Sequence, residues 1–175
     1  MTVTVRAAVL PVLLVGLAAL AACGDPVDEG PTAQLSGADT TVQVRPSFYG
    51  ATLADGAGHT LYQFSADTAG TPTCVDACAQ IWRPYIALGE PGPKDGNVHA
   101  VEPEQIATVT RADGRQQVTY FGHPLYYFAN DGAPGDPVHA DDVRGAGQRQ
   151  FGGTWSAVSA SGVPVAPNGS TVVPD

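Results

Sequence analysis

The sequence predicts an antiparallel all-β domain with little helix, built from two tandem meander-like repeats that a pseudo-two-fold axis relates. Three observations predict this fold class. A ten-residue segment recurs further along the chain, residues 40–160 are rich in Gly, Pro, Tyr, Val and Thr, and no long stretch of them has a helical period. Short strands joined by turns are the structure that this pattern favours.

The repeated segment is residues 58–67, GHTLYQFSAD, which returns as residues 122–131, GHPLYYFAND. Six of the ten positions are identical, and each copy reaches a tryptophan further on, Trp82 in the first and Trp155 in the second. A match of this quality is not expected by chance in one short chain. We therefore interpret the two segments as copies of one supersecondary unit.

The two copies are expected to share one domain. They should span about residues 40–100 and 101–165, within a domain of residues 40–175 that ends in a short C-terminal tail. A chain of this length is sufficient for one ordinary domain, or for two small units with a common core.

Each copy should contain several short strands. Outside the repeated segments, strands are expected at residues 40–45, 49–54, 81–87, 106–111, 116–121 and 154–159. Glycine-containing turns at residues 55–58 and 120–123 place a chain reversal before each repeated segment. Helix should be limited to short pieces near residues 77–81 and 102–106.

Side-chain alternation divides each repeated strand between two faces. Tyr62 and Phe64 should point to one side of the sheet and Leu61 to the other, because successive residues of a strand point to opposite faces. In the second copy, Tyr126 and Phe128 should likewise share a face.

Residues 1–22 have the features of a cleavable signal peptide. The positively charged Arg6 precedes an apolar run, residues 7–20, and small residues follow immediately before Cys23. The apolar run is too short to span a bilayer, which needs ~20 residues in a helix. Leu-Ala-Ala-Cys resembles the lipobox of bacterial lipoproteins, and this resemblance implies that Cys23 becomes the acylated N-terminus of a protein anchored outside the cytoplasmic membrane.

Composition places limits on partners. The formal net charge of the chain is −9, and loss of Arg6 with the signal peptide makes the mature charge −10. An acidic surface repels phosphates, so nucleic-acid binding is not expected and membrane attachment should come from the lipid. Residues 23–39 contain Pro, Gly and acids with no aromatic residue, which predicts a disordered tether after the lipidated cysteine.

Cys74 and Cys78 remain once Cys23 is assigned to lipid. An extracytoplasmic compartment favours their oxidation to a local disulfide. A redox-active pair and a metal site are the alternatives. Zinc would need two more soft ligands, and Ala79 stands where a c-type haem motif would need a histidine.

At these residues the chain resembles a bacterial family of lipoproteins and secreted proteins, the secreted repeat of unknown function. The family motif, Tyr-x-aromatic-x-x-Asp, matches residues 62–67 and 126–131. Further matches are Cys74-x-x-x-Cys78-Ala79-x-x-Trp82, Gly122-His123-Pro124-Leu125-Tyr126 and Phe151-Gly152-Gly153-x-Trp155. The resemblance covers about residues 40–160 and implies no particular biochemical activity. One departure is Arg83, which replaces the first proline of the Trp-Pro-Pro sequence common in the family.

The repeated motif supplies the candidate ligand-binding residues, which are Tyr62, Phe64, Asp67, Tyr126, Phe128 and Asp131. One interpretation is that the rings pack in the core and each aspartate ends its strand by accepting hydrogen bonds from turn amides. The other places both copies around the symmetry axis, where they form a small polar and aromatic cleft. Such a cleft could bind a small ligand, or hold tyrosines close enough to carry an electron.

The repeated histidines, His59 and His123, are weak candidates for metal ligands. Together with Asp67 and Asp131 they would form an acceptable donor set for a divalent transition metal. However, eight residues of extended chain separate each histidine from its aspartate, about 26 Å at ~3.3 Å per residue. We expect turn histidines, and no metal or cofactor is assigned. The acidic loop, residues 131–142, lacks the ligand spacing of an EF-hand and is expected to be solvated.

These observations favour a membrane-anchored extracytoplasmic lipoprotein that acts as a non-enzymatic binding or structural module of the cell envelope. It is expected to be a monomer that contacts a small ligand or an envelope protein. The alternative is an extracytoplasmic redox or electron-transfer accessory protein that uses Tyr, Trp or a metal or haem cofactor. A hydrolase is a third hypothesis, although the sequence contains no Gly-x-Ser-x-Gly elbow, phosphate loop or His-Glu-x-x-His helix.

Overall fold

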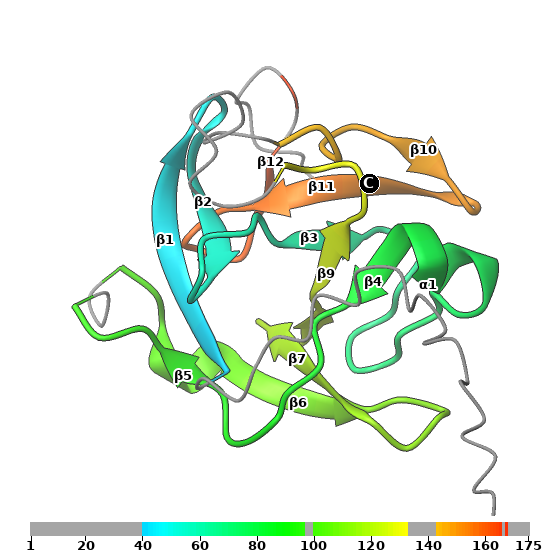
Figure 1. The fold of residues 1–175 in the computed structure, drawn as a ribbon, viewed down its shortest axis with the longest axis horizontal. Helices are drawn as coiled ribbons and strands as arrows, with labels where there is room; N and C mark the ends of the chain where they lie inside the picture. Colours follow the sequence, from blue (N-terminus) through cyan, green and yellow to red (C-terminus); the bar gives the residue numbers. More distant parts are fainter. Residues whose placement is uncertain (1–39, 97–99, 133–142, 166, 168–175) are drawn as a thin grey trace, which may run out of the picture. The chain divides into compact units, whose positions relative to one another are not determined.

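Short β-strands, mostly antiparallel, make up most of the regular structure in the computed structural model (Figure 1). The structure describes residues 40–96, 100–132, 143–165 and 167, all within the compact unit Leu35–Asp175. The predicted signal peptide, Cys23, the tether and most of the acidic loop lie outside the described residues. The fold class predicted from sequence is confirmed, since the α-helix among these residues is only five residues long.

The regular elements are short, and most of them are strands of two to seven residues. In chain order the strands are β1 (Thr41–Ser47), β2 (Gly50–Asp55), β3 (Tyr62–Phe64), β4 (Trp82–Pro84), β5 (Gly92–Pro93), β6 (Ile106–Thr110), β7 (Gln116–Tyr120), β8 (His123–Pro124), β9 (Tyr126–Phe128), β10 (Arg149–Gln150), β11 (Gly153–Val158) and β12 (Pro164–Val165). The helix α1 (Ala77–Ile81) precedes β4, and a 3-10 turn (Pro103–Gln105) precedes β6.

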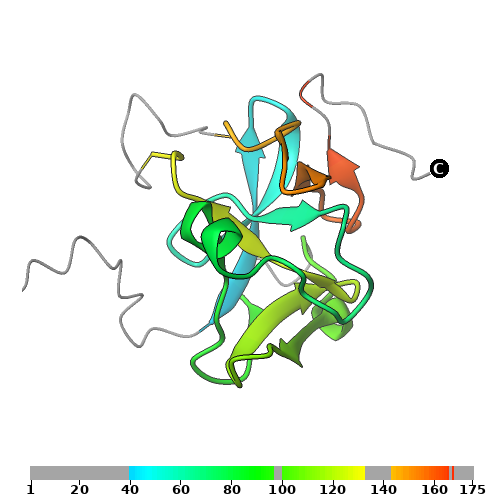
Figure 2. The ribbon, with the colours of Figure 1, turned by 90° about the vertical axis from the view of Figure 1, so that its right-hand side faces the viewer.

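A sheet of six strands forms the centre of the domain. Its strand order is β10-β11-β3-β9-β4, with β12 added to β11. Two smaller sheets flank it, β2-β1-β5 and β6-β7-β8, and within them only β5 pairs in parallel. In Figure 2 the β1–β2 hairpin rises above the central strands and the β6–β7 hairpin lies below them.

Four adjacent strands of the central sheet, β11-β3-β9-β4, come alternately from the two copies. β3 and β9, the two repeated strands, pair antiparallel with Tyr62 opposite Tyr126. β11 of the second copy lies on the outer side of β3, with Trp155 opposite Phe64. β4 of the first copy lies on the outer side of β9, with Trp82 opposite Phe128. Each copy therefore places its tryptophan strand against the repeated strand of the other copy.

The flanking hairpins show the same exchange. β1 and β2 pair with Val42 opposite Asp55, and β6 and β7 pair with Ile106 opposite Tyr120. An isolated bridge joins Thr52 of the first copy to Ser159 of the second, and another joins Gln117 of the second copy to Ile86 of the first. These reciprocal pairings are those that a two-fold axis would generate. The axis relating the complete halves remains a prediction.

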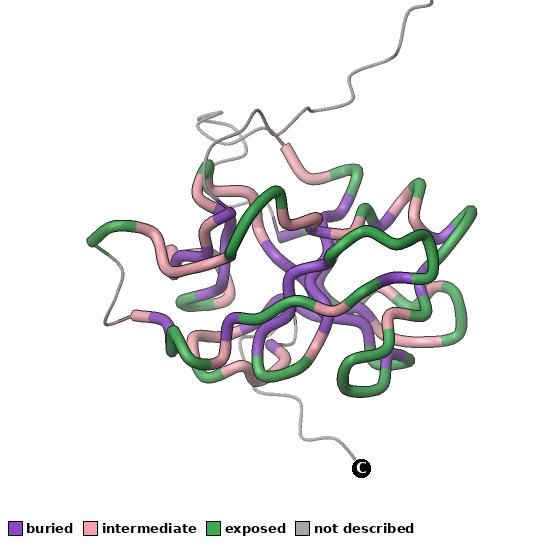
Figure 3. Tube along the Cα trace, turned by 90° about the horizontal axis from the view of Figure 1, so that it is seen from below, coloured by how far each residue is buried: buried purple, intermediate pink, exposed green. Residues whose placement is uncertain are grey.

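Both faces of the central strands are buried, as Figure 3 shows where the buried segments converge. The tryptophan cluster on one side comprises Tyr62, Phe64, Cys74, Cys78, Trp82, Tyr126, Phe128, Val143, Ala146, Trp155, Ala157 and Val165. The aliphatic cluster on the other comprises Val42, Leu53, Leu61, Tyr85, Val101, Ile106, Val118, Tyr120, Leu125, Tyr127 and Val158. The division of the repeated strands into two faces is therefore confirmed.

The strand expected at residues 81–87 is shorter in the structure. Ile81 ends the helix α1, and regular pairing in β4 ends at Pro84, which has no amide hydrogen to continue the ladder. The two-residue strands β5, β8, β10 and β12 were not predicted, because two residues are too few to produce a periodic pattern.

Among the described residues, no helix is sufficiently long and apolar to cross a membrane.

The predicted disulfide between Cys74 and Cys78 is present, with Cα atoms 5.3 Å apart. It closes the turn that leads into α1, where Cys78 N–H donates to Val75 O at 3.0 Å. Both cysteines are buried in the tryptophan cluster. The bridge therefore fastens the start of the first tryptophan strand to the core.

Candidate functional site

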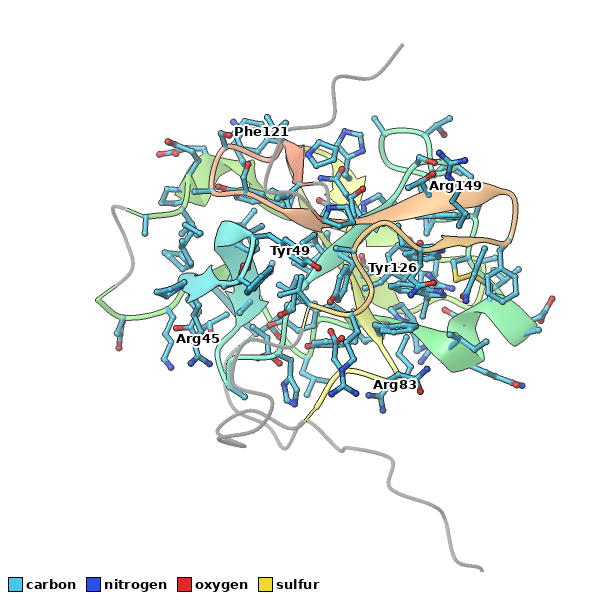
Figure 4. The ribbon with its side chains drawn as sticks, turned by 90° about the horizontal axis from the view of Figure 1, so that it is seen from above. Arg45, Tyr49, Arg83, Phe121, Tyr126 and Arg149 are labelled. Atoms are coloured by element: carbon cyan, nitrogen blue, oxygen red, sulfur yellow. A yellow bond between two sulfur atoms is a disulfide. The ribbon has the colours of Figure 1, made fainter. Side chains whose placement is uncertain are left out.

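The two repeated tyrosines exchange hydrogen bonds with the repeated aspartates. The Tyr62 hydroxyl donates to Asp131 Oδ2 at 2.6 Å, and the Tyr126 hydroxyl donates to Asp67 Oδ2 at 2.8 Å. Each phenol thus bonds to the aspartate of the other copy. Figure 4 shows Tyr126 in the interior, with Phe121 and Arg149 nearer the periphery. Both tyrosines are fully buried; the Tyr126–Asp67 bond is buried as well, whereas the Tyr62–Asp131 bond is partly buried.

The loops that follow the repeated strands hold the aspartates in place. Asp67 Oδ1 accepts hydrogen bonds from the Thr73 amide at 2.7 Å and the Thr73 hydroxyl at 2.6 Å. Asp131 Oδ1 accepts from the Arg144 amide at 3.1 Å. Each aspartate therefore receives a phenol on one oxygen and an amide from the following loop on the other. Charge-assisted bonds of this kind are about twice as strong as bonds between neutral groups.

Four aromatic rings form a continuous stack beside the tyrosines. Trp82 and Trp155 are parallel, with ring centroids 3.9 Å apart. Phe64 stacks on Trp155 at 4.1 Å, and Phe128 stacks on Trp82 at 4.3 Å. Along the stack the rings come alternately from the first and second copies. Stacked aromatic pairs contribute about 0.5–1.5 kcal/mol beyond their burial, so the stack adds to the association of the copies.

The tyrosines contact the indoles at their edges. Tyr62 lies edge-on to Trp82 with centroids 5.5 Å apart, and Tyr126 lies edge-on to Trp155 at 5.2 Å. The two indole N–H groups differ in their surroundings. Trp82 Nε1 donates to Gln150 Oε1 at 3.0 Å, whereas Trp155 Nε1 is buried and meets no acceptor among the described residues.

A glycine allows a loop to approach the first tyrosine. The Gly145 amide donates to the Tyr62 hydroxyl at 3.3 Å. A Cβ atom at position 145 would lie 2.8 Å from atoms of both Tyr62 and Trp82, closer than van der Waals contact permits. Sequence reasoning did not identify Gly145, since it lies outside the repeated segment and close approach is a tertiary property.

A buried arginine links the second copy to the disulfide turn. Arg111 Nη2 donates to Cys74 O at 2.7 Å, and Nη1 donates to Gln117 Oε1. Gln117 Nε2 in turn donates to Leu125 O at 2.7 Å. The arginine is only 5% exposed. No sequence signal indicates this role, because a single cation at the end of a predicted strand is usually solvent-exposed.

The two histidines do not form a shared metal site with the repeated aspartates. His59 Nδ1 lies 2.9 Å from Asp55 Oδ2, and the same oxygen accepts the Tyr127 hydroxyl at 3.1 Å. His123 lies in the short strand β8, at the turn where sequence reasoning expected it. In the part of the chain that the structure describes, no three His, Cys, Asp or Glu side chains are grouped to hold a metal ion.

Asp55 is a buried carboxylate that the sequence analysis placed only in a turn. Its Oδ1 accepts hydrogen bonds from the amides of Ala57, Gly58 and His59 at 2.7–3.0 Å. Burial by itself would raise the pKa of Asp55. The hydrogen bonds and charge of His59, with the turn amides, outweigh burial, so the pKa lies below its usual value.

Burial raises the pKa of several phenols in the two clusters. For Tyr126, desolvation acts first, and the charge of Asp67 and the hydrogen bond to it add to the effect. For Tyr127, desolvation is again the main cause and the charge of Asp55 adds to it. The phenols therefore keep their protons at neutral pH and act as hydrogen-bond donors to the carboxylates.

The six candidate ligand-binding residues lie together but leave the rings inaccessible. Tyr62, Phe64, Tyr126 and Phe128 are all at most 6% exposed, and Asp67 is also buried. Asp131 is half-buried. This arrangement favours the packing interpretation for the rings, because a ligand would have to displace core side chains. A ligand-binding role for the six residues remains a prediction.

A family model described as "Secreted repeat of unknown function" matches residues 47–85 and 107–159. The two matched regions correspond to the two copies and include the central strands of each. No curated protein and no solved structure shows a significant match to the chain.

The exchanged tyrosine–aspartate bonds should contribute measurably to stability. Tyr62→Phe and Tyr126→Phe are each expected to lower the free energy of unfolding by roughly 1.5–3 kcal/mol, the range for a hydrogen bond to a charged group. Chemical denaturation measures the change. Tyr85→Phe is a matched control, since its hydroxyl donates to the Thr41 carbonyl and its loss should cost about 1 kcal/mol. Equal losses in all three variants would contradict a special role for the carboxylates.

The buried Asp55 should make stability depend on acid pH. Its folded pKa is depressed, so its contribution is complete above the unfolded pKa of about 3.9 and is lost as the pH falls through the folded value. Asp55→Asn should therefore be less stable than the wild type at neutral pH and lose less stability on acidification. Chemical denaturation at a series of pH values, from neutral to acid, measures the free energy of unfolding and tests this. Asp113→Asn is the exposed comparison: the hydrogen bond from Arg115 lowers the pKa of Asp113, but solvent screens this ion pair, so the substitution should change the loss of stability in acid less than Asp55→Asn does.

Proposed function

Because the chain belongs to the family described as a secreted repeat of unknown function, we propose that it is a lipoprotein whose domain serves as a non-enzymatic binding or structural module of the cell envelope. The description of the family places the protein outside the cytoplasm. The proposal adds to this an acyl anchor on Cys23 and a role in contact with another envelope component.

The Leu-Ala-Ala-Cys sequence at residues 20–23 supports the anchor. Two or three acyl chains, each contributing about 0.8 kcal/mol per buried CH₂, hold a protein stably on a bilayer, whereas one chain is marginal. The mature chain is strongly acidic, so it repels anionic headgroups. A covalent lipid would therefore supply the attachment that the surface charge opposes.

The observation that carries the module proposal is that the motif residues join the two copies. The phenols are bonded to the opposite carboxylates, and the indoles are stacked on each other. These side chains serve to hold the two copies in one rigid body. Because the repeated side chains bond to each other inside this rigid body, the loops are the parts of it that are available to contact a partner.

Among the turns that present a phenylalanine to solvent, those of Phe48 and Phe151 expose the ring most. Phe48 lies at the turn between β1 and β2 and is 84% exposed, and Phe151 lies at the turn between β10 and β11 and is 45% exposed. Phe151 has a φ of 55° and the following Gly152 a φ of 84°, both in the left-handed region that a type I′ turn requires. A bulky residue is rare there, and asparagine is preferred. A phenylalanine at this position fits a contact role.

Replacing the lipidated cysteine should release the protein. Cys23→Ser removes the sulfur that accepts the diacylglyceryl group, so the exported chain should lose its acyl mass and move from the membrane to the soluble fraction. Mass spectrometry of the exported product and membrane fractionation measure both effects. The Cys74→Ser plus Cys78→Ser variant is the control and should remain acylated. An exported wild-type product with an unmodified Cys23 would falsify the anchor.

The exposed phenylalanines should contact another envelope component. A photo-crosslinking phenylalanine analogue placed at position 48 or 151 in living cells is expected to give a discrete adduct, whereas the same probe at the exposed Glu90 should not. If Phe48 and Phe151 contact the same partner, Phe151→Asn should abolish the adduct formed from position 48. The same variant should keep or increase the melting temperature, because asparagine suits the turn. Identical adduct patterns at positions 48, 90 and 151 would count against a defined contact surface.

A further inference from the structure

The tryptophan stack and the two tyrosines form one connected set of oxidisable side chains. The indoles of Trp82 and Trp155 are in face-to-face contact, and each is in edge contact with a tyrosine. Phe64 and Phe128 close the two ends of the stack and are themselves 4% and 6% exposed. Tryptophan and tyrosine are the side chains of a packed core that give up one electron most readily. The four oxidisable side chains are therefore in continuous ring contact, with a phenylalanine at each end of the stack.

Which side chain stays oxidised depends on whether a nearby base can accept the proton that it releases. Removal of one electron makes an indole N–H or a phenol O–H strongly acidic, so the oxidised side chain is stabilised where a base can take the proton. Neither indole has such a base among the described residues. The N–H of Trp82 meets the amide oxygen of Gln150, which is a poor base, and that of Trp155 meets no acceptor. An indole that loses an electron therefore keeps its proton and remains a radical cation.

The tyrosines differ in having carboxylate partners at hydrogen-bond distance. Tyr62 donates to Asp131 at 2.6 Å and Tyr126 donates to Asp67 at 2.8 Å. Burial, with the Asp67 charge, raises the pKa of Tyr126, so this phenol holds its proton until it is oxidised. On oxidation the proton has a short path to a base that is already in place, with no rearrangement of the core.

We propose that the protein is an electron relay in which Tyr62 and Tyr126 donate an electron to the oxidised indole of the Trp82–Trp155 pair. The oxidant is a one-electron acceptor of high potential, of the class of oxygen-derived radicals formed outside the cell. It takes one electron from an indole and is reduced. Tyr62 or Tyr126 then passes one electron to the indole, and its O–H bond breaks as the proton moves to Asp131 or Asp67. The products are a neutral tyrosyl radical, a protonated carboxyl group and a restored indole.

This activity goes beyond the proposed module function and does not depend on it. The crosslinking test of the module proposal measures contacts of the exposed Phe48 and Phe151, whereas the test of the relay measures electron transfer among buried side chains. A protein could therefore fail either test and pass the other.

Laser-flash oxidation of the purified full-length protein tests the relay. Photogenerated tris(bipyridine)ruthenium(III) serves as the oxidant, and transient absorption follows conversion of the tryptophan radical to the tyrosyl radical. Freeze-quench electron paramagnetic resonance identifies the final radical. In the wild type we expect a tyrosyl radical whose formation slows in deuterium oxide. The Asp67→Asn plus Asp131→Asn variant should slow the conversion about 100-fold, since a positioned base contributes about 10²–10⁴-fold to proton transfer.

The protein offers a matched control for the loss of a carboxylate. Asp55 accepts the hydroxyl of Tyr127 at 3.1 Å, but that tyrosine belongs to the aliphatic cluster, away from the indoles. Asp55→Asn should therefore leave the rate of conversion unchanged. A conversion that slows equally in this variant would overturn the proposal, as would a tyrosyl radical that survives in Tyr62→Phe plus Tyr126→Phe.

Circular dichroism reports whether each variant is folded. If the double asparagine variant does not fold, the wild type and the single variants Asp67→Asn and Asp131→Asn decide the question. Conversion that is slower in deuterium oxide, and that each single substitution slows in part, supports the relay. Conversion at the same rate in ordinary and deuterated water, or a final radical on tryptophan in the wild type, excludes it.

Discussion

The reciprocal exchange in which the repeated tyrosine of each copy bonds to the repeated aspartate of the other holds the two halves of the domain in register. The two phenols lie opposite each other on adjacent antiparallel strands, where a single register, Tyr62 opposite Tyr126, places both hydroxyls within reach of the partner carboxylates. A slip of one residue would turn both side chains to the other face of the sheet and leave two carboxylates without these donors. An unsatisfied buried charge is costly, and Asp67 is buried, so the exchange specifies the register as well as stabilising it.

The tryptophans extend this exchange from hydrogen bonding to packing. Because β4 and β11 each pair with the repeated strand of the other copy, the two indoles meet face to face at the centre of one cluster. Neither copy has this stack within itself, since the rings alternate between copies. Burial of large aromatic side chains is the dominant stabilising contribution in a core of this kind. The two copies are therefore parts of one folding unit, and the same contacts that stabilise the core connect its oxidisable side chains.

Loops outside the repeated segments complete the arrangement with residues of special character. Gly145 brings an amide to the Tyr62 hydroxyl where any larger side chain would collide with two rings. Arg111 spans from the second copy to the Cys74 carbonyl in the disulfide turn of the first. Both residues act between segments distant in sequence. Their roles follow from the positions of their partners, and nothing in their immediate sequence neighbours indicates them.

Local periodicity, turn chemistry and short separations were enough to predict the all-β class, the duplicated unit, most of the longer strands, the helix at Ala77–Ile81 and the pairing of Cys74 with Cys78. Alternation also assigned Tyr62, Phe64 and their counterparts to one face of the sheet. It could not predict which aspartate each tyrosine would bond, that the two tryptophans would stack, or that Asp55 would be a buried carboxylate bonded to His59. These points depend on the three-dimensional fold, since an alternating pattern specifies which way a side chain points, whereas strand order and register decide what it meets.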